Sequence, residues 1–234
     1  MSDPYQENMF ERQLNDIDAV AHHYYKLMDE YFPLPSFEDV ILDKLENQYG
    51  QDELNNALSI FTSYFDEQEQ EMQQAEQNEN FPDDDFEEIF KEQPPQKAEE
   101  MMRKEQKFRE LSNVMCSMTG SLAISLCNIL ASPLAEKHYQ DSFNMLTAMS
   151  MAHLYSSRAV SELFPNHSLP LSITYAKRAR KNTAVAATLL QGITESSGSL
   201  APVLAPINSL FDKTMKAIGD FITETYKLSE EDFD

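Results

Sequence analysis

The sequence has no tryptophan, only five glycines and only two cysteines among its 234 residues. Two cysteines cannot build the disulfide framework of a small secreted domain, so a reducing, cytoplasmic location is expected. The first residues lack the basic and apolar regions of a standard signal peptide. No Gly-rich phosphate loop, nucleophile elbow, zinc knuckle or calcium-binding loop is present. The sequence therefore predicts no catalytic residue, no metal site and no cofactor.

Basic residues are also scarce. The chain has 18 of them against 40 acidic residues, which gives a formal net charge of −22. Residues 1–100 contain 27 acidic and 5 basic residues, whereas residues 101–234 contain 13 of each. Because binding to nucleic-acid phosphates requires Lys and Arg, nucleic acid is not an expected partner of the whole chain. That exclusion is weaker for the neutral second half taken alone.

Apolar residues recur at spacings of three and four, which predicts helices, and the alternation typical of strands is not evident. Three helices are expected early in the chain: one ending before Pro33, one between Ser36 and Gly50, and one from Asp52. Four longer helices are expected at about 97–130, 136–163, 171–194 and from Pro202 or Pro206 to residue 228. The predicted fold is all-α, with a C-terminal antiparallel four-helix bundle preceded by about three shorter helices and an acidic connector.

The charge distribution and the helix pattern together predict four regions. Residues 1–75 form an acidic N-terminal helical region, and residues 98–229 form the helical bundle. Between them, residues 76–97 are rich in acidic and amide side chains, a composition that cannot bury enough apolar surface to fold alone, and this region is interpreted as a flexible acidic connector. Residues 230–234 are an acidic tail.

The segment from residue 111 to residue 135 has no charged residue and is long enough to cross a bilayer. It also contains several Ser, Thr and Asn side chains, which are costly to bury in hydrocarbon. A central helix of a soluble bundle explains the same composition. A membrane partner is therefore not expected.

Two groups of residues are candidates for binding a protein partner. The first lies in the acidic connector, where Phe86, Ile89 and Phe90 have the spacing of a short amphipathic helix that folds on binding. The second is the densest basic cluster of the chain, which consists of Lys177, Arg178, Arg180 and Lys181. This cluster could bind an acidic partner, a phosphate or the acidic connector itself, and a merely solvated helix face is the simplest alternative.

A pocket inside the bundle is a rival interpretation. Its candidate lining residues are Cys116, Cys127, His153, Tyr155 and Tyr175. Buried packing positions explain the same residues without a ligand.

The favoured hypothesis is a non-catalytic helical protein-interaction or scaffold module with an acidic docking segment, which could form a homo-oligomer. The alternatives are a small-molecule-binding or enzymatic bundle with an internal pocket, and an acidic mimic of nucleic acid that inhibits a basic partner.

Overall fold

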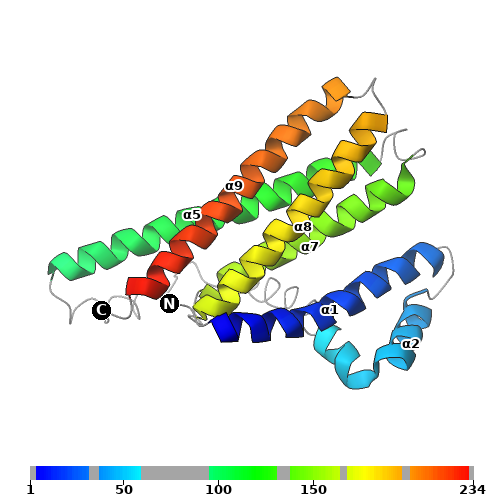
Figure 1. The fold of residues 1–234 in the computed structure, drawn as a ribbon, viewed down its shortest axis with the longest axis horizontal. Coiled ribbons are helices and arrows are strands. Elements are labelled where there is room, and N and C mark those ends of the chain that lie inside the picture. The colour runs from blue at the N-terminus through cyan, green and yellow to red at the C-terminus, as the bar shows by residue number, and fades with distance from the viewer. Residues whose placement is uncertain are drawn as a thin grey trace, which may run out of the picture. The chain divides into compact units, whose positions relative to one another are not determined.

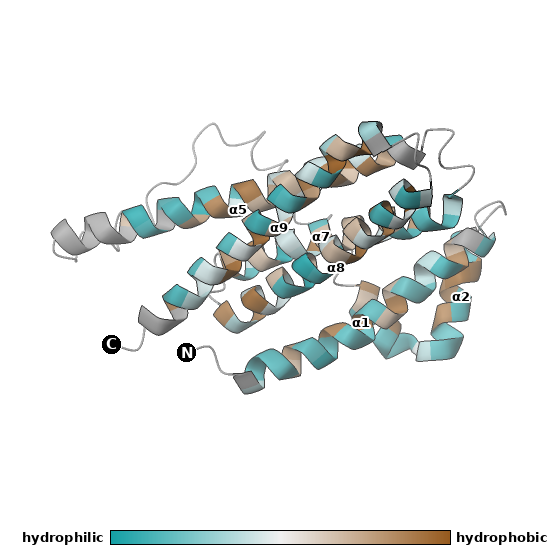
Figure 2. Ribbon diagram, turned by 45° about the horizontal axis from the view of Figure 1, so that its top comes forward, coloured by the Kyte–Doolittle hydropathy of each residue, from teal (hydrophilic) through white to brown (hydrophobic). Residues whose placement is uncertain are grey.

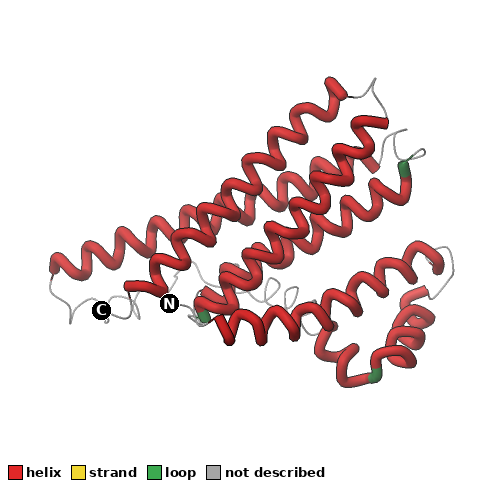
Figure 3. Tube along the Cα trace, in the orientation of Figure 1, coloured by secondary structure: helices red, strands yellow, loops and turns green. Residues whose placement is uncertain are grey.

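The computed structural model describes residues 4–31, 37–58, 95–130, 138–163, 168–196 and 201–231. Within these ranges every residue except 50, 138 and 168 is helical, and no strand is present there (Figure 3). The predicted all-α fold is therefore confirmed. The chain divides into two compact units, one made of residues 1–10 with 100–234 and the other of residues 11–99. Each unit is described separately below.

Four long helices make up most of the first unit. They are α5 (Pro95–Leu130), α7 (Tyr139–Leu163), α8 (Leu169–Ser196) and α9 (Ala201–Glu231). Successive helices run in opposite directions along the bundle (Figure 1), so the predicted antiparallel four-helix bundle is confirmed. Pro206 lies inside α9 rather than before it. Because proline has no N–H, it leaves one carbonyl of the preceding turn without its usual helical hydrogen bond.

All four helices contribute to one apolar core. Hydrophobic and hydrophilic residues alternate along each helix (Figure 2), as is typical of helices that bury one face. The core residues, each less than a tenth exposed, are Leu122, Leu126, Met145, Ala148, Met149, Ala152, Ala186, Leu190, Ile193, Leu204 and Phe211. Two of them, Met145 and Met149, are methionines, whose unbranched side chains can fill irregular gaps between helices.

Small side chains line the contact between α7 and α8. Ala152, Ser156 and Ala159 on α7 and Ala176 and Ala179 on α8 are fully buried. A direct bond also joins the two helices, because the Ser172 hydroxyl donates to the Ala159 carbonyl oxygen at 2.6 Å. Small residues allow two helices to approach closely. The two helices are therefore closely packed against each other.

The second unit is a smaller helical structure with its own core. It contains residues 11–31 of α1 (Pro4–Tyr31), helix α2 (Phe37–Tyr49) and a helical stretch at residues 51–58. Its buried core residues are Val20, Leu27, Ile41, Leu45, Leu54 and Ala57. Gly50 ends α2 with φ of 85°, a left-handed conformation that glycine adopts without steric cost. The Gly50 N–H bonds the Glu46 carbonyl at 2.9 Å.

The division of the chain differs from the expected regions in two places. The first ten residues group with the C-terminal bundle, whereas the sequence placed all of residues 1–75 in one region. Helix α5 begins at Pro95, inside the range expected for the connector. Most of the connector and part of the tail lie outside the described residues.

Among the described residues, no helix is both long and apolar enough to span a membrane.

Candidate functional site

The carboxylate of Glu7 is bound by side chains from two helices of the bundle. Glu7 lies in the first turn of α1. Lys177 Nζ on α8 donates to Glu7 Oε2 at 2.5 Å, and the Tyr226 hydroxyl on α9 donates to Oε1 and Oε2 at 3.3 and 3.2 Å. All three residues belong to the first unit. The three side chains together are called the Glu7 seat below.

The Glu7 seat combines three kinds of attraction. The Lys177 ammonium lies 5.2 Å from the centroid of the Tyr226 ring, which adds a cation–π contact to the ion pair. Partial burial acts to lower the pKa of Lys177, but the hydrogen bonds with Glu7 and Tyr226 and the charge of Glu7 outweigh it and raise the pKa. The Glu7 side chain is only 14% exposed, while that of Lys177 is 42% exposed. Lys177 and Tyr226 therefore form a partly desolvated receptor for a carboxylate.

The structure separates the predicted basic cluster into two parts. Lys177, Arg180 and Lys181 are exposed on α8 and lie within one turn of each other. Arg178 is 2% exposed and does not share their face. It lies instead with its guanidinium carbon 5.9 Å from the centroid of the Tyr155 ring. Three of the four residues thus form an outward basic face, called the α8 basic face below, and Arg178 belongs to the interior.

The other predicted partner-binding residues, Phe86, Ile89 and Phe90, lie outside the described residues. Their docking role stays a prediction. The expected folding of the acidic connector onto the basic cluster stays one for the same reason. In the structure, Lys177 forms its ion pair with a different acidic segment of the chain, the first turn of α1.

Two of the candidate pocket residues, Cys116 and His153, meet where α5 faces α7. The Thr119 hydroxyl lies 3.0 Å from His153 Nδ1 and also 3.0 Å from the Met115 and Cys116 carbonyl oxygens. The hydroxyl can donate its one proton to a carbonyl or to Nδ1, so the roles in the Thr119–His153 contact depend on the tautomer of the imidazole. Burial lowers the pKa of His153. Burial also raises the pKa of the Cys116 thiol to about 11, although a hydrogen bond with Ser157 lowers that pKa in part.

A nucleophilic role for Cys116 is disfavoured by these values, since the thiolate is the reactive form and a raised pKa makes it rare near neutrality. The His153 ring also packs against Gly120, where a Cβ atom would lie 3.3 Å from His153 Cε1. The absence of a side chain at Gly120 thus leaves room for the imidazole. The arrangement is that of a packed helix contact.

The remaining candidate pocket residues lie elsewhere. Tyr155 and Tyr175 stack between α7 and α8 with ring centroids 5.8 Å apart, and both are at least 95% buried. Burial, and to a smaller extent the charge of Glu162, raises the pKa of Tyr175. The nearby charges of Arg158 and Arg178 lower it, but by less. Cys127 is exposed on α5. Since Tyr155 is two residues from His153, the two point to nearly opposite sides of α7. The five residues therefore do not line one common site.

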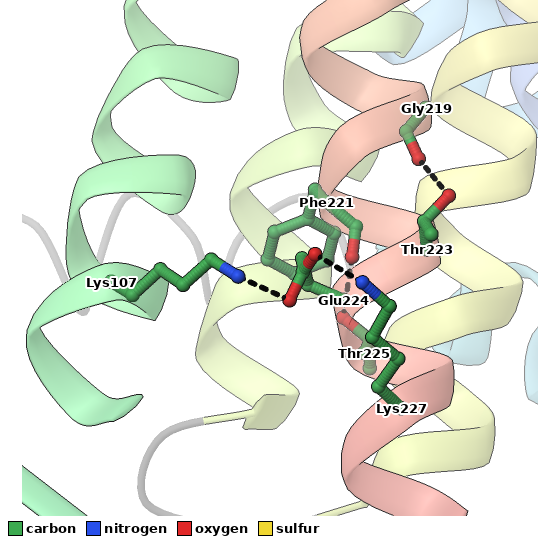
Figure 4. A network of polar contacts seen from close by, with 7 residues as sticks. All are labelled: Lys107, Gly219, Phe221, Thr223, Glu224, Thr225 and Lys227. Carbon is green, nitrogen blue, oxygen red and sulfur yellow. Dashed lines mark hydrogen bonds and ion pairs between the residues drawn. The ribbon is translucent and has the colours of Figure 1, made fainter. Parts of the chain in front are cut away.

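A second polar network joins α5 to α9 (Figure 4). Glu224 accepts from Lys107 of α5 at 2.6 Å and from Lys227 at 2.7 Å. The hydrogen bonds from Lys107 and Lys227 lower the pKa of the Glu224 carboxyl. Both lysines are more than half exposed, so the network is a surface tie between helices rather than a binding centre.

The two histidines of α1 make contacts within their own unit. His22 Nδ1 bonds the backbone oxygen of Asp18 at 2.8 Å. The His23 ring meets the edge of Tyr49 at 5.7 Å between centroids. Among the described residues, no group of three or more potential metal ligands converges.

Glu7 and Tyr226 were not foreseen as functional residues. Glu7 is one of 27 acidic residues in the first hundred, and nothing in the local sequence distinguishes it. Its partner Lys177 is 170 positions away in the sequence.

Comparison with protein-family models, with curated proteins and with solved structures finds no match. The contacts of the described residues are therefore the basis for any functional argument.

Proposed function

We propose that the chain is a non-catalytic protein-interaction module whose bundle binds acidic helical segments through α8 and α9. One observation carries the proposal. An acidic side chain on a helix is already bound there, with its carboxylate between Lys177 and Tyr226. A surface that holds one such helix has the donors and the charge to hold another.

The α8 basic face extends this receptor beyond the carboxylate that it holds. Arg180 and Lys181 follow Lys177 by three and four residues and are exposed. On a helix these spacings place the three cations on neighbouring positions of one side. Complementary charge of this kind increases the rate of association and the discrimination between partners more than it increases raw affinity. An acidic partner is thus favoured over a neutral one.

Three further points belong to the same proposal. The acidic connector, with Phe86, Ile89 and Phe90, would act as a second docking element toward another protein. A cytoplasmic location is consistent with the two cysteines being free, with Cys127 exposed. A homo-oligomer is also compatible, because the acidic first half of one chain and the α8 basic face of another have opposite charge. The contacts of the described residues do not support an internal pocket, and the nucleic-acid-mimic alternative depends on the acidic charge of residues 1–100 alone.

The test is affinity capture with matched charge-reversal variants of the full chain. One bait carries Arg180→Glu and Lys181→Glu, which leaves the Glu7 seat intact. The control carries Lys213→Glu and Lys216→Glu, the same charge change on the surface of α9. Captured proteins are quantified by mass spectrometry, and each one that depends on the α8 basic face is purified for a binding titration.

The expected result is a set of acidic proteins that the control retains and the α8 variant loses. Direct binding of a purified partner should weaken as ionic strength rises, because exposed charges are screened by salt. Equal capture by both variants would contradict the proposed function. Circular dichroism melts of both variants establish that the bundle remains folded.

A further inference from the structure

We infer that the first turn of α1 competes with partners for the receptor formed by Lys177 of α8 and Tyr226 of α9. An acidic helical partner must therefore displace Glu7 in order to bind. The inference rests on the proposed function and adds its regulation and the kind of partner. In the structure the carboxylate position between Lys177 and Tyr226 is filled by the chain's own glutamate. A partner carboxylate at this position would use the same two donors, so it would compete with Glu7 for them.

The neighbours of Glu7 indicate that this internal ligand is weakly held. Tyr5 is 77% exposed and Met9 is 42% exposed, so the large apolar side chains on either side of Glu7 remain largely in water. Phe10 is partly buried. Apolar burial of Tyr5 and Met9 therefore contributes little to the hold on this turn, and the Glu7 carboxylate provides an ion pair to α8. Ion pairs in which one partner is substantially exposed contribute little and are reduced by salt.

The spacing of the cations indicates which kind of partner helix could bind. Lys177 and Lys181 are four residues apart on α8, and about 6 Å separates such positions along a helix axis. A partner helix with glutamates at positions i and i+4 presents its two carboxylates at the same interval. Such a helix can engage Lys177 and the next turn of the α8 basic face together. The expected partner is thus an acidic amphipathic helix with paired glutamates one turn apart.

The chain itself provides the probe for this inference. A fluorescently labelled peptide of residues 1–16 contains Glu7 and Glu11, which have the required spacing. Its affinity is measured by fluorescence anisotropy for three full-length proteins. These are the wild type, the Glu7→Lys variant and the Glu7→Lys variant that also carries Lys177→Met. The lysine in the second protein repels Lys177 and expels the internal competitor.

The Glu7→Lys variant should bind the peptide about three- to fivefold more tightly than the wild type, since the weak internal ion pair no longer competes for Lys177. Adding Lys177→Met should return the affinity to the wild-type level or below. Hydrogen exchange supplies a second readout. Backbone amides of residues 5–10 should exchange faster in Glu7→Lys, while those of α7 and α8 should keep their protection, which establishes that the bundle is folded.

Two outcomes would overturn the inference, and they differ in what they say of the proposed function. Equal tight binding to wild type and Glu7→Lys, lost with Lys177→Met, would show an open receptor without internal competition, and the proposed function would stand. Equal binding that persists with Lys177→Met, or no binding to any of the three proteins, would reject the receptor at Lys177 as well. Unchanged exchange of residues 5–10 in Glu7→Lys would also refute displacement.

Discussion

Truncation of one core leucine on α5 tests how that helix is anchored in the bundle. Leu126 is fully buried, and it packs in the core to which all four long helices contribute. Leu126→Ala removes three carbon atoms, at about 0.8 kcal/mol for each buried methylene. The cavity left behind adds to this loss, and buried Leu→Ala changes usually reduce the free energy of unfolding by about 2–5 kcal/mol in total.

The same helix offers a control. Ile124 lies two residues away but is 68% exposed. Ile124→Ala should change the free energy of unfolding by no more than about 0.5 kcal/mol, as is usual for surface substitutions. In thermal melts this difference corresponds to a decrease in Tm of about 5–15 °C for Leu126→Ala and almost none for Ile124→Ala.

The assay is urea unfolding followed by circular dichroism at 222 nm, with the bundle transition fitted separately if the two units unfold in two steps. The reasoning is refuted if both variants lose similar stability, or if Leu126→Ala loses less than about 1 kcal/mol, well below the range for buried leucines. Either result would mean that α5 does not pack in the bundle as described.

Three smaller effects are also expected. The pKa of His153 is lower in the folded protein than in the unfolded chain, so the unfolded chain takes up a proton first as pH falls through about 6.5. The free energy of unfolding therefore decreases, by at most about 1.4 kcal/mol per pH unit from this residue. His153→Gln should therefore flatten the pH dependence of urea midpoints below pH 6.5, and an unchanged slope would contradict this. Gly120→Ala should stabilise the bundle by clearly less than the roughly 1 kcal/mol that alanine gains over glycine inside a helix, because its Cβ would lie 3.3 Å from His153 Cε1; the full gain in urea unfolding would mean that the imidazole shifts freely. Lys107→Met should lower stability by less than about 1 kcal/mol in urea unfolding, since its ion pair with Glu224 is exposed, and a larger loss would make that network structural.

The helices could largely be read from the sequence because local chemistry determines their ends. Pro33 lies just beyond the last residue of α1, and Gly50 ends α2 in a left-handed conformation that favours glycine. Helix periodicity also identified the four bundle helices to within a few residues. Pro206 was less informative, since its position near the start of α9 did not prevent the helix from beginning at Ala201.

The candidate site was less predictable because it depends on contacts between distant parts of the chain. Lys177, Arg180 and Lys181 were identified by their charge and spacing. Arg178 was grouped with them, yet its position toward α7 buries it beside Tyr155. Glu7 has no local signal that marks it among the acids of α1. Only the packing of the first turn of α1 with α8 and α9 brings it to Lys177 and Tyr226.

A double-mutant cycle between peptide and protein tests the central claim most directly, which is that Lys177 binds a carboxylate of an acidic helix. The peptide of residues 1–16 and its Glu7→Gln form are titrated into two full-length proteins, Glu7→Lys and Glu7→Lys with Lys177→Met. The account predicts coupling, with Lys177→Met weakening the wild-type peptide about fivefold or more and the Glu7→Gln peptide hardly at all, which corresponds to about 1 kcal/mol. Additive losses, with no coupling between the two positions, would contradict the account.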